Sequence, residues 1–216
     1  MADPATGGTP REPVAQRMIR VDITAKSYGD TPVLGDIAFE IAKGETVALV
    51  GPSGIGKSTL LRIIAGIDSG FDGTVKRPDA LAIVFQEPTL LPWRSARDNL
   101  RLIHPDLSAA DANAALDRVG LSGRGPDFPG QLSLGQQRRL SLARAFAGQP
   151  DLLIMDEPFV SLDAETADRM LTLTRSLIDD VKPATLFVTH DPREATRLAD
   201  RILTLQPQDT GAILIG

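Results

Sequence analysis

The amino-acid sequence predicts an α/β fold with a parallel-sheet core, an antiparallel β flank and an inserted α-helical region. Short, fully apolar, β-branched runs such as Thr46–Val50 are typical of strands buried within a parallel sheet. Helical patterns, notably at residues 164–181, separate several of these runs. Between about 87 and 150 the sequence carries helix signals and no convincing strand. This order of elements indicates a layered α/β architecture.

Composition limits the classes of protein to be considered. The chain has 216 residues, a formal net charge of −5 and no cysteine. This length suits one domain, or one domain with a modest insertion. Without cysteine, disulfides, thiolate metal sites and cysteine nucleophiles are excluded. The mildly acidic balance gives no footprint for a nucleic-acid partner, and no run approaches the roughly 18 apolar residues of a membrane span.

The predicted elements follow in chain order. Residues 1–17 hold three prolines and two glycines with almost nothing apolar, so we expect a disordered tail before a fold that starts near Met18. Residues 19–28 and 33–41 alternate as half-buried antiparallel strands do. Buried strands are predicted at 46–50, 81–85, 152–155, 186–189 and 202–205. Helices are predicted through about 65, at 108–119, through about 146, at 164–181 and at 193–199.

The strongest local signal is the sequence GPSGIGKST at residues 51–59, between a predicted strand and a predicted helix. It matches the G-x-x-x-x-G-K-[ST] pattern of a phosphate-binding loop, or Walker A motif. Glycines let the backbone curl so that N–H groups face phosphate oxygens, and the helix N-terminus adds partial positive charge. A glycine-rich turn capped by serine is the purely structural alternative. The expected nucleotide contacts are Gly51, Pro52, Ser53, Gly54, Gly56, Lys57, Ser58 and Thr59.

Two carboxylates end the apolar run at 152–155. Neighbouring strand residues point to opposite faces if the strand continues, so the two carboxylates can take different roles. We expect Asp156 to join the Ser58 hydroxyl in a Mg²⁺ shell, and Glu157 to polarise the attacking water. Lys57 would reach the β- and γ-phosphates. An acidic strand end before a turn is the alternative.

These motifs, and others that follow in order, resemble the nucleotide-binding subunit of ATP-binding-cassette (ABC) transporters, from about residue 18 to residue 216. The resemblance implies a P-loop NTPase fold of the ABC ATPase type. Its RecA-like core would comprise residues 18–86 and 151–216, and its helical signature subdomain residues 87–150. The further motifs are Tyr28 in the place of the adenine-stacking aromatic, Gln86 (Q-loop), LSLGQ at 132–136 (signature), SLD at 161–163 (D-loop) and His190 (switch histidine).

The resemblance also implies a nucleotide site shared between two copies of the chain. Ser133, Gly135 and Gln136 of one copy would contact the γ-phosphate held by the other, and Asp163 would make a contact across the dimer. Each motif has a structural alternative as well. Ser133-x-x-Gln136 is a capping box, and Asp163 can be the N-cap of the next helix.

The remaining candidates stand at strand ends. His190 follows an apolar run and would contact the γ-phosphate, whereas His104, the other of two histidines, is expected to be structural. Residues 191–194 (DPRE) are typical of an N-cap, an N1 proline and a capping glutamate, so Asp191 is given no catalytic role. Gln86 would ligate Mg²⁺ at a hinge, or simply cap a strand. Tyr28 could equally be an ordinary strand aromatic.

The sequence departs from the family signature at Leu134, where glycine is usual. A leucine takes a positive φ only at a cost, and it adds bulk near the expected interface. Slower hydrolysis or a looser dimer would follow, while Ser133 and Gly135 keep the main donors.

The implied function is an ATP-hydrolysing motor subunit that binds ATP and Mg²⁺, dimerises with ATP and drives an integral membrane permease. Import of a small solute, with a solute-binding protein as a further partner, fits the stretch FQEPTLLPW at 85–93, which is similar to that of nitrate, sulfonate and taurine importers. Leu91 and Trp93 would then line a docking groove, although core packing also explains them. The expected location is cytoplasmic, on the inner face of the cell membrane.

Two other classes remain as alternatives. Soluble ABC-type ATPases of DNA repair, chromosome organisation or translation carry coiled-coil arms or two cassettes, and residues 51–157 leave no room for such an arm. A P-loop kinase or GTPase would lack the signature and the switch histidine, and no guanine-reading Asn-Lys-x-Asp run occurs.

Overall fold

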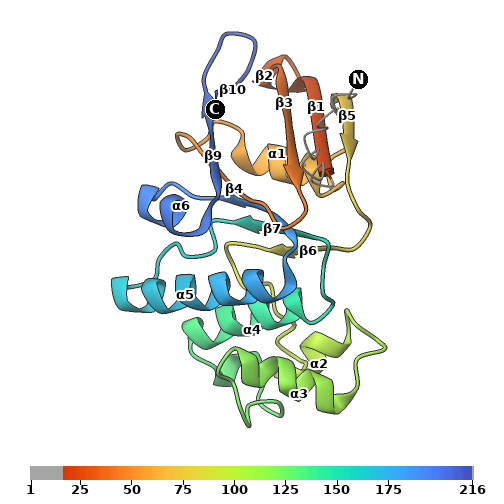
Figure 1. The fold of residues 1–216 in the computed structure, drawn as a ribbon, viewed down its shortest axis with the longest axis vertical. Helices are drawn as coiled ribbons and strands as arrows, with labels where there is room; N and C mark the ends of the chain where they lie inside the picture. The colour runs from red at the N-terminus through yellow and green to blue at the C-terminus, as the bar shows by residue number, and fades with distance from the viewer. Residues whose placement is uncertain (1–16, 216) are drawn as a thin grey trace, which may run out of the picture.

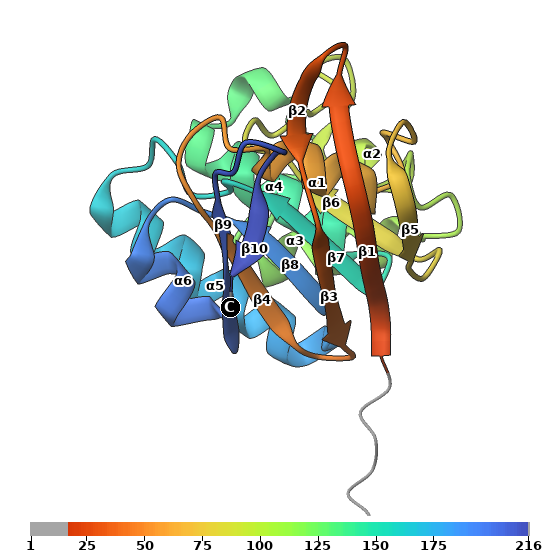
Figure 2. The same cartoon turned by 90° about the horizontal axis from the view of Figure 1, so that it is seen from above.

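The computed structural model describes residues 17–215, so the expected tail falls almost wholly outside the described residues. These residues form two sheets with a helix between them and further helices below (Figure 1). The small sheet is antiparallel, with β1 paired to all three other strands. It crosses above the large sheet (Figure 2). The strands of the small sheet are β1 (Arg17–Tyr28), β2 (Thr31–Leu34), β3 (Ile37–Ala42) and β5 (Asp72–Lys76).

The large sheet has the strand order β10-β9-β4-β8-β7-β6, and all of its pairs are parallel except β10 with β9. Four consecutive strands of this order, β4, β8, β7 and β6, therefore end at one edge, where ligands bind in open α/β sheets. The strands are β4 (Thr46–Val50), β6 (Leu81–Val84), β7 (Leu152–Asp156), β8 (Ala184–Val188), β9 (Arg201–Gln206) and β10 (Ile213–Ile215).

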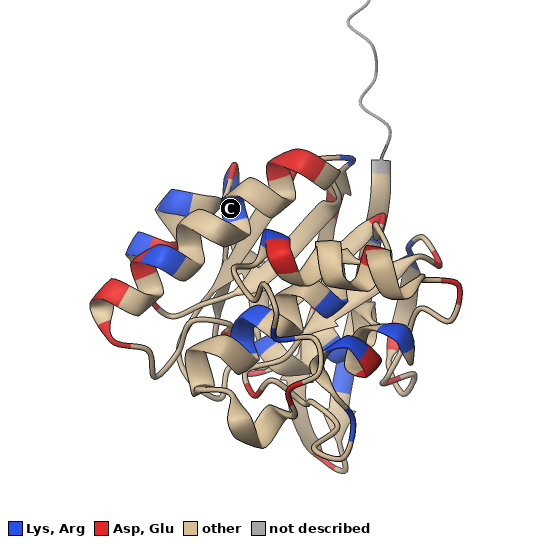
Figure 3. Cartoon of the chain, turned by 90° about the horizontal axis from the view of Figure 1, so that it is seen from below, with Lys and Arg blue, Asp and Glu red and all other residues tan. Residues whose placement is uncertain are grey.

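Helices cover both faces of the large sheet (Figure 1). Helix α1 lies between the two sheets, and α4 and α5 lie on the opposite face. Seen from below, basic and acidic segments are intermixed over the helices rather than gathered by sign (Figure 3). The helices are α1 (Lys57–Ile64), α2 (Ala96–Arg101), α3 (Ala109–Arg118), α4 (Leu134–Phe146), α5 (Ala164–Val181), α6 (Pro192–Leu198) and the 3₁₀ turn η1 (Pro129–Gln131).

Two hydrophobic cores lie on the two faces of the large sheet, and β7 contributes to both. Leu152 and Ile154 pack in the core between the sheets, whereas Leu153 and Met155 pack in the core that α4 and α5 cover. A strand buried on both faces has no polar side to show, which is why its sequence is a continuous apolar run. The predicted strands are confirmed at β4, β6, β7, β8 and β9, within a few residues at each end. Only β4, β7 and β8 are buried as predicted, because β6 lies half-buried at the sheet edge and β9 has exposed residues, including Ile202.

Between β6 and β7 the described chain holds α2, α3, η1 and α4, and no strand. Leu100, Leu116 and Leu140 of these helices share the lower core with the sheet residue Met155. The expected division into a core and an inserted subdomain stays a proposal.

One strand prediction needs correction, and two strands were not predicted. The single strand expected at 33–41 is two strands, β2 and β3, because the backbone of Gly35 leaves the hairpin and its N–H donates to the carbonyl of Ala212 at 2.8 Å. Strands β5 and β10 were not predicted. Both lie at sheet edges, and most of their side chains are exposed or half-buried, so they lack a clear hydrophobic pattern.

Candidate functional site

The loop at residues 51–56 joins β4 to α1 and opens at the carboxyl edge of the large sheet. Gly56 has a φ of 108° and precedes the first turn of α1. A Cβ atom on Gly56 would lie 2.8 Å from Cδ2 of Leu34 on β2. Glycine is therefore required twice at this position, by the backbone conformation and by the close approach of β2.

Lys57 folds back into this loop. Its side chain is only 6% exposed, and Nζ donates to the carbonyls of Gly51 and Pro52, both at 2.8 Å. These two bonds hold the ammonium at the centre of the curled backbone. A phosphate bound there would meet a positive charge already in place, together with the N-terminus of α1.

Ser58 and Asp156 meet across the edge of the sheet. The Ser58 hydroxyl donates to Oδ1 of Asp156 at 3.2 Å. Burial raises the pKa of Asp156, and the neighbouring Glu157 adds to the rise, while the Ser58 bond, Arg62 and Lys57 act in the opposite direction. Because burial disfavours the charged form of the Asp156 carboxyl, a cation bound beside it would stabilise that form.

This oxygen pair fits a Mg²⁺ ion shared with a nucleotide. Within residues 17–215 no group of three or more His, Cys, Asp and Glu side chains could hold a metal alone. Mg²⁺ commonly binds through one or two carboxylates together with substrate phosphates. Gln86 lies two residues beyond the end of β6, which pairs with β7, so it faces the same edge and is exposed.

Asp156 and Glu157 were expected to point to opposite faces if the strand continued through both residues. The strand does not continue, so that argument does not apply to Glu157. Strand β7 ends at Asp156, and Glu157 takes a φ of 45°. A left-handed conformation costs a non-glycine residue roughly 1–2 kcal/mol. The backbone N–H of Glu157 donates to the carbonyl of Val188 at 3.1 Å, which ties this strained residue to the end of β8.

His190 stands beside Glu157. Its Nδ1 lies 3.3 Å from Oε2 of Glu157, and its side chain is largely exposed. The structure therefore brings together the predicted water-activating carboxylate and the predicted switch histidine. The second histidine, His104, contacts the carbonyl of Arg144 through Nε2 at 2.9 Å, which is a structural contact.

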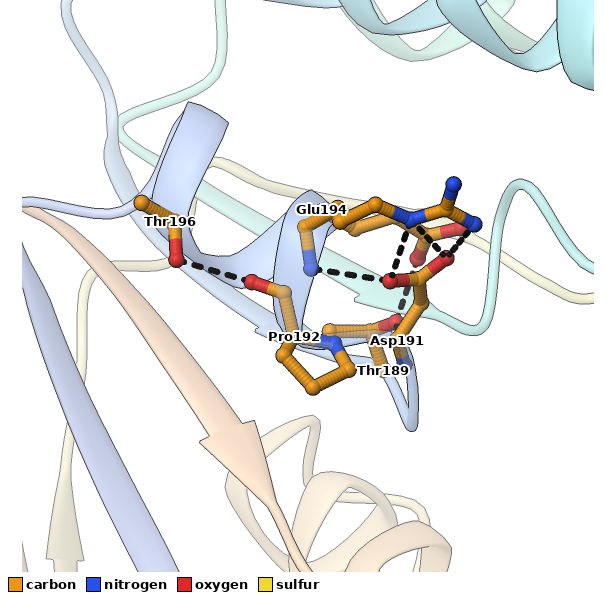
Figure 4. Close-up of polar contacts among 6 residues, drawn as sticks. Thr189, Asp191, Pro192, Glu194 and Thr196 are labelled. Carbon is orange, nitrogen blue, oxygen red and sulfur yellow. Dashed lines mark hydrogen bonds and ion pairs between the residues drawn. The ribbon is translucent and has the colours of Figure 1, made fainter.

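The turn after His190 differs from the predicted capping pattern (Figure 4). Asp191 is the N-cap of α6, as predicted, and its Oδ1 accepts a bond from the N–H of Arg193 at 2.8 Å. Glu194, however, does not cap the helix. The Thr189 hydroxyl accepts a hydrogen bond from the N–H of Asp191 at 3.0 Å and donates its own proton to the Glu194 carboxylate. The contact between Thr189 and Glu194 was not predicted from the sequence.

Tyr28 lies in a polar cluster that was also missed. Its ring is 51% exposed, and its hydroxyl donates to Oδ2 of Asp68 at 2.9 Å. Nζ of the buried Lys26 lies 4.4 Å from the ring centroid and donates to Oδ1 of Asp68 at 2.8 Å. The Lys26 bond is the main reason why the pKa of Asp68 is low. One ring face of Tyr28 is thus taken by a cation.

The signature residues lie apart from the loop. Ser133 and Gln136 form the predicted capping box. The Ser133 hydroxyl accepts a hydrogen bond from the Gln136 N–H at 3.3 Å, and Oε1 of Gln136 accepts one from the Ser133 N–H at 2.8 Å. Ser133 and Gly135 line a groove of about 510 Å³ beside α5. Across residues 17–215 no hydrogen bond or ion pair joins either of them to residues 51–59. Asp163 is exposed and caps α5 through the Thr166 N–H at 3.0 Å.

Leu134 does not strain the backbone, contrary to expectation. Ser133 is the N-cap and Leu134 is the first residue of α4, so no positive φ is needed there. The bulk remains, because Leu134 is 48% exposed next to the signature donors.

An apolar groove of about 450 Å³ lies between β6 and the helices α2 and α4. Leu91 lines it, but its backbone is also held by Asn99 at 2.8 Å. Trp93 is 69% exposed and lies outside the lining. The principal apolar lining is Leu81, Ile83, Phe85, Leu102 and Ile103.

Known proteins resemble the chain in sequence and in fold. The model of the family described as ABC transporter matches residues 34–160. The aliphatic sulfonates import ATP-binding protein SsuB 2 of Burkholderia lata is 43% identical over 203 residues, 89% of this chain and 74% of that protein. SsuB 2 of Nocardia farcinica is 48% identical over 195 residues, 88% of this chain and 80% of that protein. The ATP-binding cassette MJ0796, solved as a dimer in a post-hydrolysis state with ADP and Pi, matches with a TM-score of 0.75 and 28% identity, over 88% of this chain and 94% of that one.

Proposed function

The chain belongs to the ABC transporter family as an ATP-hydrolysing subunit, and we propose that two copies close around two MgATP and thereby drive a separate membrane permease. One observation carries this proposal: three neighbouring strands, β4, β8 and β7, bring the loop, Asp156, Glu157 and His190 to one edge of the sheet. The roles of these residues follow from their contacts.

We assign phosphate binding to the loop at residues 51–56 and to Lys57. Nζ of Lys57 would exchange its two carbonyl contacts for phosphate oxygens, to which the backbone N–H groups of Gly51 and of residues 53–56 would also donate. Ser53 and Thr59 lie in the loop and in the first turn of α1, from which they would reach the same phosphates. Ser58, Asp156 and Gln86 would hold Mg²⁺, which when bound neutralises charge on the β- and γ-phosphates.

Water activation falls to Glu157. Its carboxylate would accept a proton from the water that attacks the γ-phosphate, and His190 at 3.3 Å would contact that phosphate and orient Glu157. Tyr28 would stack on adenine with the ring face that Lys26 leaves open.

The signature residues support a two-chain site. Ser133 is exposed at the start of a 13-residue helix, where N–H groups favour an anion. Asp163 is exposed as well. Within residues 17–215 no hydrogen bond or ion pair joins Ser133 or Gly135 to the loop, so a second copy is the natural source of the nucleotide for Ser133, Gly135 and Gln136, and the MJ0796 dimer is in line with this.

The apolar groove beside β6 supports a permease partner. Leu102 and Ile103 are large, exposed side chains at one rim, and an amphipathic helix fits such a groove. No helix within residues 17–215 is long and apolar enough to cross a bilayer. We place the subunit in the cytoplasm, on the inner face of the cell membrane.

The relatives named as aliphatic sulfonates importers point to a small sulfonate as the imported solute, delivered by a solute-binding protein. The test is uptake of a labelled alkanesulfonate by cells whose copy of this gene is replaced by variants. Wild type is expected to restore uptake, and Glu157→Gln and Ile103→Glu are expected to abolish it.

Ile215→Glu provides the matched control for Ile103→Glu. Ile215 is also exposed, but it lies on β10, at the edge of the large sheet opposite β6. Full uptake with Ile103→Glu would contradict the groove as docking site. Full uptake with Glu157→Gln would contradict coupling of this ATPase to transport.

A further inference from the structure

The Thr189 hydroxyl closes a hydrogen-bonded turn with Asp191 and also contacts Glu194 (Figure 4). Thr189 is 1% exposed at the end of β8. Its hydroxyl accepts a bond from the N–H of Asp191 at 3.0 Å and donates to Oε2 of Glu194. A bond from residue i to the N–H of i+2 is a side-chain-closed turn, and His190 is its central residue.

The end of β8 also holds Glu157, which follows the neighbouring strand β7. The N–H of Glu157 donates to the carbonyl of Val188 at 3.1 Å, and the N–H of Thr189 donates to that of Leu49 at 3.4 Å. Glu157 is therefore bonded to Val188, the last residue of β8, two positions before His190. The path of the turn then decides how far Nδ1 of His190 lies from the Glu157 carboxylate, now 3.3 Å away.

Glu194 occupies an unfavourable place for a carboxylate. Burial raises its pKa, and the charges of Asp191 and Glu157 act in the same direction, against the Thr189 bond and His190. An uncharged side chain would avoid this cost. Helix α6 does not need Glu194 as a cap, because Asp191 already serves as N-cap.

We propose that Thr189 and Glu194 are positioning residues that hold the His190 turn against Glu157 and so set the rate of ATP hydrolysis. The inference rests on the proposed role of His190 at the γ-phosphate. Neither residue touches the reacting atoms, so both act through His190, and their loss should lower turnover without weakening nucleotide binding.

The test uses pairs of variants that separate shape from hydrogen bonding. Thr189→Val keeps the shape and loses the hydroxyl, whereas Thr189→Ser keeps the hydroxyl. Glu194→Met keeps the length and loses the acceptor, whereas Glu194→Gln keeps an acceptor oxygen. Each is made in the wild-type chain and in His190→Ala, and kcat, KM and MgATP affinity are measured.

We expect Thr189→Val and Glu194→Met to lower kcat by about tenfold at unchanged KM and MgATP affinity, as misplacement of a group does. Thr189→Ser and Glu194→Gln should keep most of the turnover. In the His190→Ala background none of the four should lower kcat further, because the residue they position is absent.

Three results would overturn the positioning role: unchanged kcat in Thr189→Val and Glu194→Met, an equal loss in both backgrounds, or a loss in Glu194→Gln as large as in Glu194→Met. Wild-type turnover in His190→Ala alone is a different failure, since it would remove the proposed role of His190 itself. Unchanged MgATP affinity in each variant shows that the chain is folded.

Discussion

The Ser58 hydroxyl donates to Oδ1 of Asp156 at 3.2 Å, although 98 positions separate the two residues in the chain. This bond joins the start of α1 to the end of β7. It places a hydroxyl and a carboxylate oxygen side by side, where hard oxygen ligands suit Mg²⁺.

Replacement of Asp156 should separate stability from function. Because burial raises the pKa of Asp156, its charged form destabilises the fold at neutral pH, and Asp156→Asn should raise the thermal unfolding temperature of the ligand-free protein. The gain should shrink as pH falls through the raised pKa towards the ordinary value of 3.8, where the wild-type carboxyl becomes protonated. Mg²⁺-dependent ATP binding should be lost.

Thermal unfolding between pH 4 and 8 and nucleotide titration with and without Mg²⁺ check this prediction. Asp151→Asn, just before the other end of β7, is the control and should leave Mg²⁺ dependence unchanged. Full Mg²⁺-dependent affinity in Asp156→Asn would refute the metal assignment.

Loss of Lys57 should abolish tight MgATP binding. The ammonium is held at the centre of the loop by two carbonyls at 2.8 Å. We expect Lys57→Ala to weaken affinity by about a hundredfold, the scale of one lost charge-assisted contact of roughly 2–3 kcal/mol. Calorimetric titration measures it, with the exposed Lys43→Ala as control. Wild-type affinity in Lys57→Ala would show that the loop binds no phosphate.

Glu157→Gln should bind MgATP and fail to hydrolyse it. An amide cannot take up the proton of the attacking water, so turnover should fall by about 10²–10⁴-fold, the range of general-base catalysis. Phosphate release and nucleotide affinity are measured together, with Glu40→Gln on β3 as the control. Turnover near that of wild type would exclude Glu157 as the base.

Leu134→Gly should raise turnover or strengthen the dimer. Leu134 needs no special backbone conformation, so its effect comes from exposed bulk beside Ser133 and Gly135. Leu134→Ala removes the same bulk without the roughly 1 kcal/mol loss of helix propensity that glycine brings, and should act in the same direction. ATP hydrolysis and sedimentation with ATP test both variants. If neither changes either property, the position is neutral.

Tyr28→Ala should weaken binding of MgATP and leave binding of inorganic triphosphate unchanged. The ring would contact adenine alone, and loss of base stacking costs about 1–3 kcal/mol, or roughly 10- to 100-fold in affinity. Tyr28→Phe keeps the ring and loses the bond to Asp68, so it separates stacking from the cluster. An equal loss for ATP and triphosphate would indicate damage to the fold instead.

The elements and residues that sequence predicted are those set by local chemistry. The run at 152–155 is apolar on both strand faces, and α5 begins and ends at the predicted residues because Asp163 caps an amphipathic stretch. The glycines of the phosphate-binding loop at 51–56 could also be identified from the local sequence pattern. Contacts between distant segments were not predicted: β5 and β10 form only because a neighbouring strand pairs with them.

The missed side chains have the same cause. Lys26 looks like any strand lysine until the fold brings Asp68 to it, 42 positions away. Glu194 fits a capping pattern in sequence, and only the position of the Thr189 hydroxyl in the turn redirects its carboxylate.

The most direct test of the account is light scattering of purified Glu157→Gln with and without ATP. We expect a monomer without nucleotide and a dimer with ATP, since each site needs the loop of one copy and the signature of the other. A monomer under both conditions, with ATP binding demonstrated in the same sample and Leu134→Gly added to remove the bulky side chain, would contradict the shared site.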